Sequence, residues 1–148
     1  MTVLGSFVVG QTLKASDMNI IGTWSSFTVV TTGSANMTFT GQKCVLNKIC
    51  FFQIVGTATG ACTPPTQVTL PETMASSNVA VGFQAAYLDD SATVWYYGPA
   101  QRRNSTEINT RAFNVSATYM TSNGLTNLIP FTWASGDLFV LNGQYEIA

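Results

Sequence analysis

The sequence has no histidine and very few charged residues of either sign. Six Lys and Arg and seven Asp and Glu give a net charge of −1 and a charged fraction of 9%, where globular proteins carry about 25%. The missing histidine excludes Ser-His-Asp and Cys-His catalysis and removes the commonest metal ligand. P-loop and GxGxxG patterns are absent as well. We therefore expect no cofactor and no metal site.

Candidate catalytic carboxylates are equally scarce. Asp89 and Asp90 are the only adjacent pair, and glycoside hydrolysis needs two carboxylates. Their neighbours Ser91 and Ala92 offer no apolar pocket of the kind that keeps a catalytic acid protonated. We interpret the pair as a hydrophilic hairpin turn and predict that the protein is not an enzyme.

Basic residues do not cluster, since only Arg102 and Arg103 are adjacent. Nucleic-acid binding requires a basic face, so we expect no nucleic-acid partner. The apolar start, Met1 to Gly10, is short and has no basic residue before it. Neither a signal peptide nor a membrane span fits this segment.

Uncharged polar residues take the place of the missing charges, because Thr, Ser, Asn and Gly are abundant. Thr favours strands, and the other three favour turns. From Ser25 onward, short apolar or alternating runs are cut by turn residues, with a loop expected at Thr57 to Thr66. This pattern predicts an all-β fold, an antiparallel β-sandwich of the jelly-roll type. The expected strands are Ser25–Thr31, Met37–Leu46, Ile49–Gly56, Val68–Leu70, Val79–Leu88, Ala92–Tyr97, Glu107–Phe113, Ala117–Thr121 and Leu138–Ile147, the last interrupted near Asn142-Gly143.

The first two dozen residues differ from the rest, which divides the chain into an arm (1–24) and a sandwich domain (25–148). Ser16 and Asp17 are candidate N-caps for one short helical turn that stops at Gly22. Lys14 and Asp17 are the only charges in this apolar segment. We expect it to be an attachment arm that docks on a neighbour, although packing against its own domain stays open. The apolar residues expected to make the attachment are Phe7, Val9, Leu13, Met18, Ile20 and Ile21.

Asn47-Lys48 is expected to form a two-residue hairpin turn. The register would place Val45 opposite Cys50 and Cys44 opposite Phe51. Cys44 and Cys50 would then point to opposite faces of the sheet, so a disulfide between them is not expected. We interpret these thiols, together with Cys62, as buried and reduced.

This hairpin is apolar on both faces, whereas a sheet with one wet face alternates apolar and polar residues. Either the domain covers both faces, or another subunit buries one of them. With so little charge, we predict a homo-oligomer, a trimer in the first instance, while a monomer solubilised by hydroxyls and amides remains the alternative. The residues assigned to the subunit interface are Leu46, Ile49, Phe51 and Val55.

Three consecutive aromatic residues, Trp95, Tyr96 and Tyr97, fall in a predicted strand. Trp95 and Tyr97 would share one face, and Tyr96 would take the other. They could form a platform that stacks on sugar rings, but packing in a core or a subunit interface is the preferred interpretation.

Two terminal segments and the central hairpin are similar to a known family. The segments are "FVVGQTLKASDMNIIGTW" (Phe7 to Trp24) and "IPFTWASGDLFVLNGQYEIA" (Ile129 to Ala148), with "CVLNKICFFQI" between them. In this combination and order they resemble bacteriophage virion surface proteins, the small capsid decoration, minor tail and fibre β-sandwich modules. The second segment resembles the last hairpin of those proteins.

The resemblance implies a trimeric or clustered module on the outer surface of a phage capsid or tail, made in the host cytoplasm. Its partners would be other virion proteins, such as the major capsid or tail protein. No functional residues transfer, because the family has no common active site. A structural module is the first hypothesis, and a module that binds a host-surface glycan receptor is the alternative.

Overall fold

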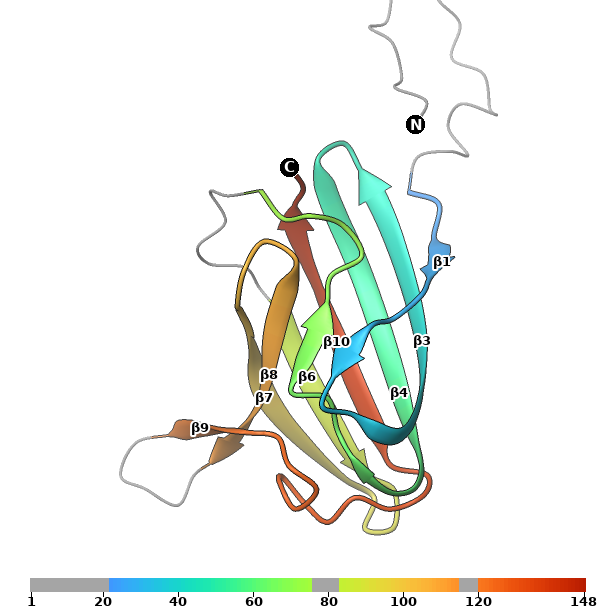
Figure 1. Ribbon diagram of the computed structural model, residues 1–148, viewed down its shortest axis with the longest axis vertical. Coiled ribbons are helices and arrows are strands. Elements are labelled where there is room, and N and C mark those ends of the chain that lie inside the picture. The colour runs from blue at the N-terminus through green and yellow to red at the C-terminus, as the bar shows by residue number, and fades with distance from the viewer. Residues whose placement is uncertain (1–21, 76–82, 115–119) are drawn as a thin grey trace, which may run out of the picture.

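The computed structural model describes residues 22–75, 83–114 and 120–148, which form ten β-strands (Figure 1). All strand pairs are antiparallel and the described residues contain no helix, so the predicted all-β class is confirmed. The strands are β1 (Ser25–Phe27), β2 (Thr31–Thr32), β3 (Ala35–Leu46), β4 (Ile49–Thr63), β5 (Gln67–Thr69), β6 (Phe83–Asp89), β7 (Val94–Arg102), β8 (Glu107–Asn114), β9 (Thr121–Gly124) and β10 (Leu138–Glu146).

The strands form one continuous sheet in the order β1-β3-β4-β10-β6-β7-β8-β5-β2, with β9 paired to β8. β1 and β2 are the two ends of this sheet, yet only residues 28–30 separate them in the chain. Four Cα steps span at most about 15 Å, so the sheet must curl until its ends approach. The result is a half-barrel in which one curled sheet, rather than two separate ones, encloses the core (Figure 1).

The β3–β4 hairpin has the predicted register. Cys44 lies opposite Phe51 and Val45 opposite Cys50, so the two thiols point to opposite faces as expected. Asn47 has a φ of 54°, which asparagine tolerates better than most residues. The prediction for this turn is confirmed.

β4 is longer than predicted, because it continues to Thr63 where a loop was expected from Thr57 to Thr66. The loop prediction was therefore wrong for residues 57–63, and only residues 64–66 of the predicted loop lie outside a strand. Ala58, Gly60 and Ala61 have little strand propensity of their own, but hydrogen bonds to the start of β3 hold this part of the strand extended. Asn36 Nδ2 donates to the Ala61 carbonyl (2.9 Å), and Thr59 Oγ1 donates to the Asn36 carbonyl (3.1 Å).

β10 lies in the middle of the sheet, between β4 and β6. The C-terminal segment is therefore not a hairpin, which corrects the expectation from the resemblance. Nor is β10 interrupted at Asn142-Gly143, because it pairs without a break from Leu138 to Glu146. Gly143 lies between Phe52 and Phe83 in the paired strands, and the centroids of those two rings are 5.8 Å apart. A glycine leaves room there for both rings.

Aromatic side chains fill much of the core. Trp133 is 1% exposed and stacks on Phe131, with 4.6 Å between ring centroids. It also meets Tyr87 edge-on at 6.1 Å, and its indole N–H donates to the Ile129 carbonyl. Trp133 therefore packs inside the core.

All three cysteines are buried and free of disulfides. Burial raises the pKa of the Cys62 thiol from 9.0 to about 11, and the nearby Asp137 carboxylate adds to the shift. Burial also raises the pKa of Cys50. The Cys50 and Cys62 thiols are therefore protonated at neutral pH and behave as small apolar side chains.

Most of the predicted arm lies outside the described residues, which include only Gly22, Thr23 and Trp24 of it. The predicted helical turn falls almost wholly on residues that are not described. The six attachment residues, Phe7, Val9, Leu13, Met18, Ile20 and Ile21, also lie outside the described residues.

Candidate functional site

One face of the curled sheet looks away from the core, and we call it the outer face. It is formed by β3, β4, β10, β6 and β7, whose inward side chains include Phe52, Ile54, Leu141 and Tyr87. Among the described residues whose side chains project outward from these five strands, Glu146 is the only charged one. The ion pairs Lys43–Glu72 and Arg103–Glu107 involve none of these outward residues. The outer face is thus nearly free of charge.

An apolar patch occupies the end of the outer face beside the β3–β4 turn. Leu46 and Ile49 lie opposite each other and are 40% and 36% exposed. Phe51, which is partly exposed, projects to the same side. We call Leu46, Ile49, Phe51 and the neighbouring Trp24 the hairpin patch. Three of the four predicted interface residues are therefore together on one surface, and the fourth, Val55, lies further along β4.

The described chain begins beside the hairpin patch. A Cβ placed on Gly22 would lie 3.8 Å from Cys44 Sγ, and Cys44 is the strand partner of Phe51. Trp24 and Phe51 line a hollow of about 340 Å³ together with Asn142 and Gln144. The segment that precedes Gly22 is therefore attached at this end of the outer face.

Exposed aromatic residues stand at the diagonally opposite corner, on β7. Trp95 and Tyr97 are 45% and 50% exposed and project outward, opposite Leu88 and Ala86 of β6. Tyr96 points inward, with its ring centroid 5.1 Å from that of Phe131. The predicted alternation is confirmed. The packing interpretation holds for Tyr96, whereas Trp95 and Tyr97 remain open to solvent among the described residues.

A row of carboxamides crosses the outer face from strand to strand. The register places Gln42, Gln53, Asn142 and Gln84 side by side on β3, β4, β10 and β6. All four are exposed, and their side chains make no hydrogen bond with another described residue. We call these four residues the amide row. Sequence analysis missed it, because the row arises only when strands far apart in the chain pair in this register.

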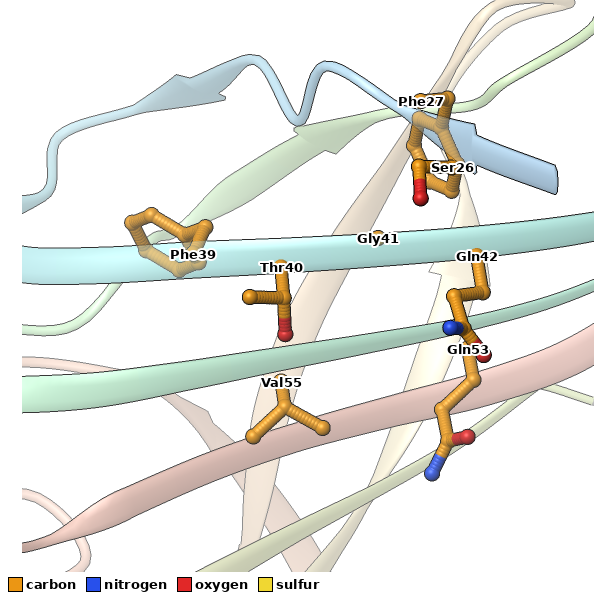
Figure 2. Close-up of a pocket in the computed structure, with 8 residues that line it drawn as sticks. All are labelled: Ser26, Phe27, Phe39, Thr40, Gly41, Gln42, Gln53 and Val55. Carbon is orange, nitrogen blue, oxygen red and sulfur yellow. The ribbon is translucent and has the colours of Figure 1, made fainter.

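Beside the amide row runs a parallel row of Thr40, Val55, Val140, Ala86 and Tyr97. At the β3–β4 side the two rows line a hollow of about 530 Å³. Figure 2 shows Thr40, Gln42, Gln53 and Val55 projecting to the same side of the two strands in this hollow. Ser26, Phe27, Phe39 and Gly41 complete its lining.

The Asp89 carboxylate is used within the β6–β7 turn itself. Asp89 Oδ1 accepts hydrogen bonds from the Ser91 hydroxyl (2.8 Å) and the Ala92 N–H (3.0 Å). In the described part of the chain, no three or more Cys, Asp or Glu side chains are grouped to hold a metal ion. The described ranges likewise contain no helix long and apolar enough to cross a membrane.

Comparisons of the chain with models of protein families, with curated proteins and with solved structures found no match.

Proposed function

We propose that the chain is a non-enzymatic contact protein of a bacteriophage particle. It would be a small decoration or minor tail or fibre module on the outer surface of the capsid or tail, made in the host cytoplasm. The observation that carries the proposal is the hairpin patch, which places exposed Leu46, Ile49 and Trp24 close to Gly22, where the N-terminal segment joins the sheet.

Burial of the hairpin patch against a partner would remove its apolar surface from water. Burial of a large apolar side chain stabilises by roughly 1.5–3 kcal/mol, and clustered exposed apolar residues mark interaction sites. None of the four residues of the patch is charged, and the nearest charged side chains are Lys48 in the adjoining turn and Glu146 at the margin. We propose two partners for the hairpin-patch end of the outer face. One is a second copy of the chain, in a homotrimer, and the other is a major capsid or tail protein.

The experiment is incorporation into particles assembled with variant genes. We expect a chain lacking residues 1–22 to fold and to be missing from purified particles, since it lacks the arm. We expect Ile49→Asp, which places a charge in the hairpin patch, to reduce its copy number per particle at least tenfold. The matched control is Leu128→Asp, because Leu128 is 63% exposed and lies in the loop before β10.

Incorporation of both altered chains at normal copy number would contradict the proposal. The number of copies per particle also places the module, since hundreds indicate the capsid and a handful indicate the tail tip. Imaging of labelled particles checks that placement independently.

A further inference from the structure

We propose that the outer face also binds a neutral oligosaccharide chain, which lies across the strands from the hollow on β3 and β4 to Tyr97 on β7. The site combines the amide row with the parallel row that ends at Tyr97. It shares no residue with the hairpin patch, although Asn142 also lines the hollow beside Trp24 and Phe51, and it goes beyond the proposed role in assembly.

The geometry suits an extended chain molecule. β3 and β7 are separated by four strand spacings of about 4.8 Å, so the row that ends at Tyr97 runs for about 19 Å. The amide row ends on β6, three spacings from β3, and runs for about 14 Å. The hollow of about 530 Å³ lies at one end, and the exposed ring of Tyr97 lies at the other. Tyr97 is followed in its row by Ala86, whose small side chain does not cover the ring.

The amide row supplies the polar contacts that sugar hydroxyls require. A carboxamide both donates and accepts hydrogen bonds, as a hydroxyl does. The four side chains of the row make no hydrogen bond with another described residue, so a ligand would not have to break existing ones. A regular series of such groups matches a polymer that repeats its hydroxyls along its length.

The aromatic residues and the absence of charge select the class of saccharide. Tyr97 and Trp95 present exposed rings, on which the apolar C–H face of a sugar ring can stack. Neither row contains a Lys, Arg, Asp or Glu, so nothing compensates the charge of a sialylated or uronic-acid chain. An extended peptide is less well suited, because it pairs its main chain with a sheet edge rather than with a face.

The test begins with an array of neutral and acidic oligosaccharides, probed with the full-length protein. The tightest neutral oligosaccharide is then titrated in solution by calorimetry, which measures the single-site affinity without help from clustering. We expect Tyr97→Ala to weaken binding about tenfold, equivalent to about 1.4 kcal/mol. Tyr97→Phe keeps the ring, so its affinity for the oligosaccharide should stay within about twofold of the parent's. Gln53→Ala should weaken binding several-fold.

Ile49→Asp separates this inference from the proposed function. It should leave the affinity for the sugar unchanged while it disrupts assembly, whereas Tyr97→Ala should do the reverse. The inference is overturned by an array with no neutral binder, by binding to acidic chains alone, or by equal affinity in Tyr97→Ala and the parent. A change of oligomeric mass in Tyr97→Ala would overturn it as well, because the face would then be a subunit contact.

Discussion

Asp137, the residue before β10, accepts a hydrogen bond from the backbone N–H of Asp90 in the β6–β7 turn, at 2.9 Å from Oδ1. Its other carboxylate oxygen accepts from the Ala134 N–H at 2.6 Å. Asp137 is 1% exposed, so a buried charge is used to join two segments 47 residues apart. This contact holds the β6–β7 turn in place. Trp95 and Tyr97 lie on β7, directly after that turn.

Replacing Asp137 by Ala should lower the free energy of unfolding by about 2 to 5 kcal/mol, because two N–H groups lose their acceptor. Asp137→Asn keeps one carbonyl oxygen as an acceptor, so its free energy of unfolding should fall by less. Asp90→Ala should change stability little, because Asp90 takes part through its backbone. Urea unfolding measures all three, and a stable Asp137→Ala protein would show that the contact is dispensable.

The surroundings of Asp89 and Asp90 in the β6–β7 turn do not suit a catalytic role. Asp89 accepts two hydrogen bonds within its own turn, and Asp90 is exposed, so neither lies in an apolar pocket of the kind a glycosidase acid needs. We predict that incubation with host cell wall or polysaccharide releases no reducing sugar, even where the protein binds. Sugar release that disappears in Asp89→Ala or Asp90→Ala would refute the prediction.

Gly98 of β7 cannot be replaced by a larger residue. A Cβ added there would lie 1.7 Å from the Arg111 carbonyl oxygen of β8 and 2.8 Å from the Ala112 Cα, and backbone atoms cannot move aside as a flexible side chain can. We expect Gly98→Ala to cost more than about 3 kcal/mol of stability. Gly60→Ala is the control, since no atom lies within 4 Å of its added Cβ. Similar melting temperatures for the two variants would mean that β7 and β8 are not so close.

The buried thiols predict a loss of stability at alkaline pH. Unfolded cysteine loses its proton near pH 9, whereas the pKa of folded Cys62 is about 11. Above pH 9 the unfolded state therefore binds fewer protons than the folded state, and stability falls as the pH rises. Calorimetry between pH 8 and 10 should show a falling melting temperature, with a smaller fall in Cys62→Ala. If the melting temperature falls equally with pH in the parent and in Cys62→Ala, Cys62 is not the cause of the alkaline loss of stability.

Local signals were sufficient for the elements that carry their own pattern. The Asn47-Lys48 turn and the alternation of Trp95, Tyr96 and Tyr97 follow from two-residue periodicity and turn chemistry, and both are confirmed. The extension of β4 to Thr63 could not be predicted, because its strand geometry depends on hydrogen bonds to Asn36 of another strand.

The positions of the strands within the sheet depend on pairing between segments that are far apart in the sequence. Leu138–Glu146 reads as a terminal strand, but its place between β4 and β6 depends on which segments it meets in space. For the same reason the amide row has no signature in the sequence, since Gln53 and Asn142 become neighbours only through that pairing. The cluster of Leu46, Ile49 and Phe51 was easier to predict, because one hairpin contains all three residues.

The central claim is that the chain acts through contacts at the hairpin patch, and the mass of the purified protein in solution tests it most directly. Sedimentation equilibrium at micromolar concentration should give three times the 15.9 kDa chain mass for the parent and for Leu128→Asp. Ile49→Asp should give a single chain mass. A monodisperse monomer for the parent, or an assembly that Ile49→Asp leaves intact, would contradict the account.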